Sequence, residues 1–312
     1  MNASSRTTPT TSTRAGVRRG IARATIMNLA VVLACTIALQ PLAGCVSNQQ
    51  SAVDAWRPPP GHTTVDRFEL IRDAADLEAL YTLAGGLKPM SNGIWQESFE
   101  LENLDLVELR LVRRALSHLR NDVWYADVQV FDNANDGERR AQAFVVHRDA
   151  LARMIERHET FWSPRGITPC THPAEIVAIV DRMPRADRWR GYGYLYGYPD
   201  DAVDFFVEAG VAAAEDGREM GPGKDREFMQ IPTHVARTGR FTYAVPLDHA
   251  PSPTDRALKE KAGLILAAYE ERRPYMTDDE DMVEMLRELN DRFEELSIME
   301  HHSAHEKNVV RP

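Results

Sequence analysis

The chain has few cysteines and lacks several common catalytic motifs. Its 312 residues include three cysteines, Cys35, Cys45 and Cys170, and no Cys-x-x-Cys pair. This scarcity excludes a disulfide-stapled scaffold, a zinc ribbon and a thioredoxin-like redox site. The sequence also contains no glycine-rich phosphate loop and no G-x-S-x-G motif, which weakens the case for a nucleotide-binding protein or an α/β-hydrolase.

Basic residues are outnumbered by acidic ones. The chain has 37 Lys and Arg against 47 Asp and Glu, a formal net charge of −10. Residues 1–44 contain arginines and no acidic residue, so the chain that follows them is more acidic still. Nucleic-acid binding depends on neutralising phosphates with Lys and Arg, so this balance argues against a nucleic-acid partner. It also argues against electrostatic adhesion to anionic lipid.

No hydrophobic run is long enough for a comfortable transmembrane helix. The most apolar stretch, residues 25–40, is uncharged and follows a segment that carries arginine as its only charged residue. A bilayer span needs about 20 apolar residues. A basic segment, a short apolar segment and then small residues are typical, in this order, of a secretory signal peptide. We therefore expect residues 1–44 to be a signal peptide.

The four residues Leu42-Ala43-Gly44-Cys45 resemble the lipobox of bacterial lipoproteins. The resemblance implies cleavage before Cys45 and a covalent lipid on its thiol, with acyl chains such as palmitate, and no other cofactor. Val46 after the cysteine is similar to the pattern for outer-membrane sorting in Gram-negative bacteria. The expected location is thus extracytoplasmic, on a bacterial membrane. An ordinary cleaved signal and a short anchor helix are the alternatives, and the remaining chain resembles no characterised family.

The chain beyond the signal peptide divides into three parts. Residues 45–62 are polar and then rich in proline, which predicts a lipidated cysteine followed by a stiff tether. Residues 63–296 are expected to form the globular domain, and residues 297–312 a flexible polar tail that contains histidines.

Hydrophobic periodicity predicts an α+β fold, with a small antiparallel sheet packed against several helices. Two hairpins are expected, near residues 123–147 and 228–245, the first around the turn-forming residues 133–137. The segments with helical spacing are residues 73–83, 99–119, 150–161, 171–183, 199–214, 254–269 and 278–296. Because the strands are clustered and not alternated with helices, α+β is favoured over a doubly wound sheet.

The most unusual segment is Trp189–Pro199, in which tyrosines occur at every second position. In an extended conformation the four tyrosines would share one face, a platform able to stack on sugar rings and to form hydrogen bonds. An envelope glycan or an envelope protein is then the expected partner. The alternative is that these rings pack at the edge of the core. The tyrosines are Tyr192, Tyr194, Tyr196 and Tyr198.

Two arginines in or just before this segment, Arg188 and Arg190, are further candidates for ligand binding. Their guanidinium groups can hold a phosphate or carboxylate in a bidentate manner. The alternative is that they form ion pairs with the aspartates that follow, Asp200, Asp201 and Asp204.

Cys170 and His172 are weak catalytic candidates. A nucleophilic cysteine needs a base within hydrogen-bond reach and often lies at a helix N-terminus, and these residues precede an expected helix. His158 and Glu159 could join them. An inert thiol is the alternative, since side chains two residues apart seldom point at each other.

The carboxyl-terminal histidines His301, His302 and His305 form the densest group of possible metal ligands. A solvated tail is the alternative interpretation. Taken together, the sequence favours a lipid-anchored envelope protein that binds a partner without catalysis. The other hypotheses are an extracytoplasmic hydrolase built on Cys170 and His172, and a metal-binding protein that uses the tail.

Overall fold

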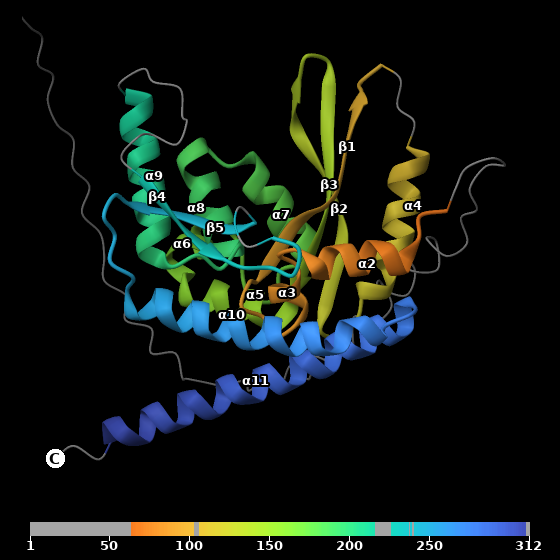
Figure 1. The fold of residues 1–312 in the computed structure, drawn as a ribbon. Helices are drawn as coiled ribbons and strands as arrows, with labels where there is room; N and C mark the ends of the chain where they lie inside the picture. Colours follow the sequence, from red (N-terminus) through yellow and green to blue (C-terminus); the bar gives the residue numbers. More distant parts are fainter. Residues whose placement is uncertain (1–63, 103–105, 216–225, 237, 239, 310–312) are drawn as a thin grey trace, which may run out of the picture. The chain divides into compact units, whose positions relative to one another are not determined.

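A computed structural model shows that the chain has an α+β fold (Figure 1). The structure describes residues 64–102, 106–215, 226–236, 238 and 240–309, and side chains only as far as residue 294. The predicted signal peptide and tether therefore lie outside the described residues.

Helices make up most of the described chain. The α-helices are α2 (Arg67–Asp76), α3 (Leu80–Leu83), α4 (Val107–Ala115), α5 (Arg148–Arg157), α6 (Glu159–Trp162), α7 (Pro173–Arg182), α8 (Arg185–Leu195), α9 (Asp200–Glu215), α10 (Pro253–Arg272) and α11 (Asp279–Val309). Short 3₁₀ helices are η1 (Leu116–Leu119), η2 (Ser163–Arg165) and η3 (Arg273–Tyr275).

The strands form two antiparallel sheets, and both predicted hairpins are confirmed. One sheet has the order β1-β3-β2 and the other pairs β4 with β5. The strands are β1 (Met90–Glu100), β2 (Trp124–Asn135), β3 (Glu138–His147), β4 (Arg226–Ile231) and β5 (Phe241–Pro246). Asp136 and Gly137 connect β2 to β3, both with positive φ. Positive φ at both central residues is the geometry of a tight hairpin turn.

The three-stranded sheet lies between two hydrophobic cores. Side chains alternate along its strands, so Trp124 and Ala126 face one core while Tyr125 faces the other. The first core is closed by α2, α3, α4, α10 and α11, and the second by α5 to α9. Figure 1 shows α10 and α11 running side by side on one side of the sheet.

Two expectations about the first part of the domain are wrong. Residues 90–100 form β1, although residues 99 and 100 were expected to begin a helix, and the helix starts only at Val107. The expected helix over 73–83 is split, because α2 ends at Asp76 and α3 begins at Leu80. A register shift between Asn92 and Gln96 interrupts the pairing of β1. This bulge breaks the alternation by which a strand is recognised.

A buried histidine links the end of β3 to α5 and α11. His147, at the end of β3, accepts a hydrogen bond at Nδ1 from Ala150 N–H (3.2 Å). Its Nε2 is 2.8 Å from Asn290 Oδ1 on α11, and this oxygen also accepts from Gly85 N–H at 3.1 Å. Burial lowers the pKa of His147, which is consistent with a neutral ring that donates through Nε2.

The last helix is longer than the sequence predicts. We expected it to end at residue 296 and to be followed by a flexible tail, whereas α11 continues to Val309. The side chains of His301, His302 and His305 lie outside the described residues.

Candidate functional site

The tyrosine-rich segment is a helix and not an extended strand. Residues 185–195 form α8, so the expectation that four tyrosines share one face of an extended segment is wrong. A helix places residues four apart on one side, and the rings of Tyr192 and Tyr196 stack with centroids 5.6 Å apart. Tyr198 joins them after the helix turn, with its ring 5.8 Å from that of Tyr196.

The helix ends in a Schellman motif centred on Gly197. Tyr198 N–H donates to Gly193 O (3.1 Å) and Gly197 N–H donates to Tyr194 O (3.0 Å). Gly197 has a φ of +68°, the left-handed conformation that this motif requires. The turn brings Tyr198 back beside Tyr196, so three of the four tyrosines meet.

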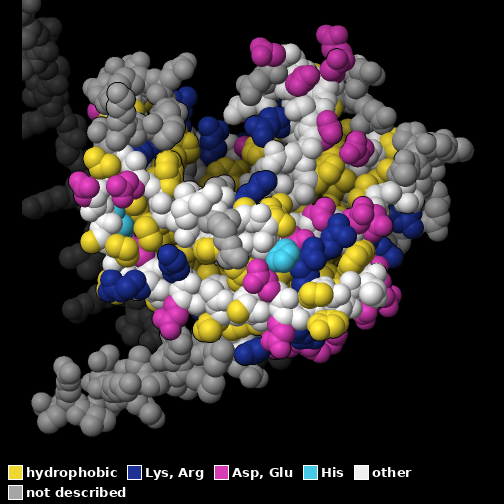
Figure 2. Space-filling view, in the orientation of Figure 1, with side chains coloured by type: hydrophobic (Ala, Val, Ile, Leu, Met, Phe, Trp, Pro, Cys, Tyr) yellow, Lys and Arg dark blue, Asp and Glu magenta, His cyan; other side chains and the backbone are white. Residues whose placement is uncertain are grey.

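These three tyrosines line a cavity of about 350 Å³ between α8, α9 and the β4–β5 hairpin. Four further aromatic rings and several small residues complete what we call the aromatic pocket. Its lining consists of Trp189, Tyr192, Gly193, Tyr196, Tyr198, Ala202, Val203, Phe206, Phe228, Thr242, Tyr243 and Ala244. Figure 2 shows hydrophobic side chains at the surface over α9, β4 and β5. The volume is at the low end of the range of small-molecule sites, about 300–1,000 Å³.

The phenol groups of the aromatic pocket are neutral hydrogen-bond donors at physiological pH. Burial raises the pKa of Tyr192 to about 12, and it also raises the pKa values of Tyr196 and Tyr198. The hydroxyl oxygen of Tyr192 accepts from Gln129 Nε2 (2.8 Å), and that of Tyr196 accepts from Asn92 Nδ2. Each of these two hydroxyls therefore retains a proton to donate.

An ion pair between a buried lysine and a glutamate lies next to the ring of Tyr196. Lys88 Nζ lies 2.8 Å from Glu78 Oε2, and the lysine side chain is 1% exposed. The ammonium also lies 5.5 Å from the ring centroid of Tyr196 and 4.7 Å from that of Phe241, which are cation–π distances. Burial lowers the pKa of Lys88. This charge therefore lies within cation–π distance of Tyr196, a ring that lines the pocket.

Tyr194 and Arg190 belong to a different part of the second core. The Tyr194 ring stacks on that of His158, 3.8 Å away. Its hydroxyl accepts from Arg190 (3.2 Å), and Arg190 also forms an ion pair with Asp204. Arg190 thus fits the alternative interpretation, in which it forms an ion pair with a following aspartate.

Arg188 likewise makes an internal contact, because its guanidinium donates to the carbonyl oxygen of Asp181 (3.2 Å). Neither Arg188 nor Arg190 is among the residues that line the aromatic pocket. The structure thus separates these two candidates from the three tyrosines.

The two main residues of the hydrolase hypothesis, Cys170 and His172, do not contact each other through a hydrogen bond in the described structure. Cys170 is exposed. His172 Nδ1 accepts from Ala174 N–H (3.3 Å) and so caps α7, while its ring packs edge-on against Tyr125 (4.7 Å). Burial is the main cause that lowers the pKa of His172. This geometry holds the imidazole as a helix cap.

The two further members of that hypothesis do not complete a catalytic group. His158 stacks on Tyr194, and its Nε2 is 3.4 Å from Asp200 Oδ1. Glu159 is exposed at the start of α6.

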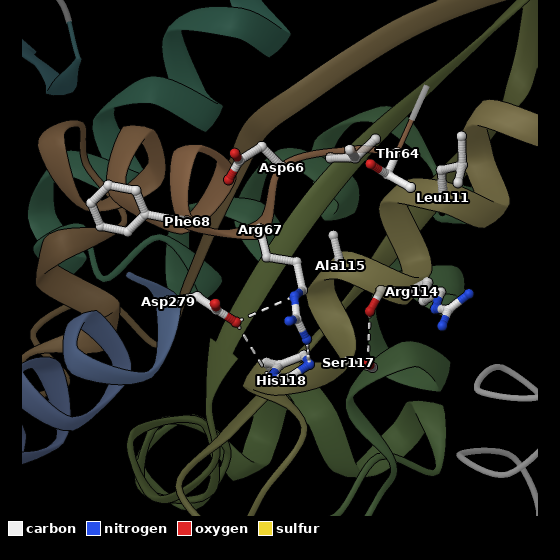
Figure 3. Close-up of a pocket in the computed structure, with 11 residues that line it drawn as sticks. Thr64, Asp66, Arg67, Phe68, Leu111, Arg114, Ala115, Ser117, His118 and Asp279 are labelled. Carbon is white, nitrogen blue, oxygen red and sulfur yellow. Dashed lines mark hydrogen bonds and ion pairs between the residues drawn. The ribbon is translucent and has the colours of Figure 1, made fainter. Parts of the chain in front are cut away.

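A second cavity, of about 490 Å³, lies between the N-terminus of α2, the end of α4 and the start of α11 (Figure 3). Its central charged groups bind one another. Arg67 Nε is 3.3 Å from Asp279 Oδ2, His118 Nδ1 is 3.8 Å from the same oxygen, and Arg67 also contacts His118 Nε2. Nε2 of His118 is therefore occupied by Arg67, and the charged groups of this cavity face one another.

No group of three or more His, Cys, Asp or Glu side chains among the described residues could hold a metal ion. Nor does any helix in this part of the chain have the length and hydrophobicity to span a membrane. No family model, curated protein or solved structure matches the chain.

Sequence reasoning missed four aromatic rings of the pocket, those of Trp189, Phe206, Phe228 and Tyr243. Trp189 lies within the tyrosine-rich segment and, three residues before Tyr192, has the spacing of one helix face. A helical interpretation of the segment would have included it. Phe228 and Tyr243 lie on the two strands of the predicted hairpin and Phe206 on α9, and nothing in the sequence indicates that this hairpin packs against α8 and α9.

Proposed function

We propose that the protein is a lipid-anchored binding module of the bacterial cell envelope, which holds a sugar ring of a glycan in the aromatic pocket. The observation that carries this proposal is the meeting of Tyr192, Tyr196 and Tyr198 with four further aromatic rings around one small cavity.

The chemistry of the lining favours a sugar over a purely apolar ligand. A pyranose ring has an apolar face that can stack on aromatic rings and hydroxyl groups that need hydrogen-bond partners. The aromatic pocket supplies the ring faces, and we propose that the neutral phenols of Tyr192 and Tyr196, which each keep a proton, donate to the sugar hydroxyls.

The same lining favours binding over catalysis. None of its residues is a carboxylate, a histidine or a cysteine. Glycoside hydrolysis normally requires a pair of carboxyl groups on either side of the scissile bond. A ligand in the aromatic pocket would therefore be held and not cleaved.

The lipid anchor is supported by the lipobox-like residues Leu42-Ala43-Gly44-Cys45 after an uncharged apolar stretch. Diacylated or triacylated Cys45 would attach the protein stably, since each buried CH₂ contributes about 0.8 kcal/mol. Residues 46–62, if extended, span up to about 50 Å. This reach would allow the domain to bind a glycan at some distance from its membrane.

Removing an exposed ring of the aromatic pocket should abolish most glycan binding. Phe228 is 45% exposed and Trp189 is half-buried, so alanine at either position should leave the fold intact. We expect Phe228→Ala and Trp189→Ala each to weaken binding at least about ten-fold, or 1.4 kcal/mol. The measurement is a glycan array, followed by titration of the best binder with full-length protein in a non-glycosidic detergent.

Tyr275→Ala is the matched control, because Tyr275 is 75% exposed and does not line the aromatic pocket. It should bind glycan as the wild type does. If no glycan binds, or if Tyr275→Ala is as defective as the two pocket variants, the proposed function is wrong.

The anchor is tested independently of the ligand. Cys45→Ser should move the protein from the membrane fraction to the soluble fraction or leave it unprocessed, because serine offers no thiol for the lipid. Mass spectrometry of the wild-type terminal peptide should show Cys45 as the first residue with an acyl mass added. A native chain that retains residues 1–44, or that lacks this mass, would contradict the anchor.

A further inference from the structure

Two arginines outside the lining of the aromatic pocket contact rings that line it, and neither has an ion-pair partner in the described residues. Arg226, at the start of β4, lies over the ring of Phe206, with its guanidinium carbon 5.6 Å from the ring centroid. Arg185, at the start of α8, lies over the ring of Trp189 at 5.9 Å. The rings of Trp189 and Phe206 meet edge to face, 5.8 Å apart. Both guanidinium groups therefore flank the same pair of pocket rings.

On α8, Arg190 is neutralised by an ion pair, whereas Arg188 contacts a backbone carbonyl. The partner of Arg190 is Asp204 on α9, and Asp187 on α8 forms an ion pair with Arg165 at 2.8 Å. The chain as a whole has more acidic than basic residues. Two arginines that pair with no acid among the described residues, both against rings of one pocket, indicate a local preference for negative charge. Figure 2 shows Lys and Arg side chains between α9 and the β2–β3 hairpin.

The same cations argue against a cationic ligand. Aromatic cages commonly bind ammonium groups through the faces of their rings. Here the rings of Phe206, Trp189 and Tyr196 each already have a cation within 6 Å, from Arg226, Arg185 and Lys88. A further positive charge would be repelled by all three.

We propose that the aromatic pocket is selective for an acidic sugar. Its ring stacks on the aromatic side chains, and its carboxylate binds Arg185 and Arg226 at the pocket. A guanidinium group binds a carboxylate through two parallel hydrogen bonds, which gives geometric selectivity as well as affinity. This inference rests on the proposed function and narrows its ligand class.

The test compares acidic glycans with neutral glycans of the same ring structure. An array of neutral and uronic-acid glycans is probed with full-length protein, before and after the carboxyl groups are reduced to primary alcohols. We expect binding to the uronic-acid glycans and a loss of about ten-fold or more in affinity on reduction. Arg185→Gln and Arg226→Gln should each cause a similar loss, and raising the salt concentration should weaken wild-type binding.

Arg292→Gln is the matched control, since Arg292 also lies over an aromatic ring, that of Phe293 at 5.4 Å, but belongs to α11. It should bind acidic glycans normally. If neutral and acidic glycans bind equally well, the acidic-sugar inference is overturned while the proposed function stands. If Arg292→Gln is as defective as the pocket variants, the inference is also overturned. If no glycan binds, both proposals fail.

Discussion

Replacing Glu78 by glutamine is expected to lower the free energy of unfolding by about 3 kcal/mol or more. The carboxylate of Glu78 is the hydrogen-bonded partner of Lys88 Nζ, at 2.8 Å. The lysine side chain is 1% exposed, so Glu78→Gln leaves a buried ammonium without its counter-charge. The rings of Phe241 and Tyr196 compensate for only part of this loss. Urea unfolding followed by circular dichroism measures the change.

Lys88 is more deeply buried than Glu78, so variants of the two residues serve as controls for each other. Glu78 is 21% exposed, so its carboxylate can reach water when the lysine is removed. Lys88→Met should therefore cost less than Glu78→Gln, and the double variant should resemble Lys88→Met. Equal losses in the two single variants would show that the ammonium is not stabilised chiefly by Glu78.

The loss of stability caused by Glu78→Gln should depend on pH, because the ammonium group of Lys88 titrates. Burial lowers its pKa below that of an exposed lysine, about 10.4. A cation with a lowered pKa in the folded state destabilises the fold at low pH, and this penalty disappears as the pH rises past the unfolded pKa. Removing the Glu78 carboxylate lowers the pKa of Lys88 further. The difference between Glu78→Gln and the wild type should therefore be largest near pH 7 and shrink towards pH 10.

The elements with strong local signals were predictable from the sequence. Both hairpins were found because apolar residues cluster in short segments and, in the first, turn-forming residues separate the two strands. The helices α9 and α10 were found because their apolar residues recur at three and four positions. In these segments the local pattern and the tertiary packing agree.

The tyrosine-rich segment was misinterpreted because its pattern fits two periods. Alternate tyrosines suit a strand, but Tyr192 and Tyr196 are also neighbours on a helix. Packing decides between the two. A Cβ on Gly193 would lie 2.7 Å from Val203 Cγ2, so only glycine allows α8 and α9 to approach this closely. The partner helix is not visible in the local sequence, and the strand β1 was missed for a similar reason, because its bulge is set by pairing with β3.

Replacing Gly197 by alanine should destabilise the fold by at least about 2 kcal/mol and disrupt the aromatic pocket. A Cβ at this position would lie 2.6 Å from the carbonyl oxygen of Leu87 and 3.1 Å from Pro89 Cδ. Neither the backbone oxygen nor the proline ring can move without displacing Lys88, which lies between them in the chain. The φ of +68° adds strain for any residue with a side chain.

Gly166→Ala separates the cost of the positive φ from the cost of the steric clash. Gly166 has nearly the same φ, +72°, but a Cβ there would have no atom within 4 Å. This variant should show the conformational cost alone, about 1 kcal/mol, and should bind glycan normally. Gly197→Ala should cost clearly more in thermal or urea unfolding and should bind glycan weakly even under conditions where it is fully folded, because the turn that brings Tyr198 beside Tyr196 would be displaced. If both variants lose the same stability, the close approach of Gly197 to residues 87–89 does not contribute, and the aromatic pocket does not depend on it.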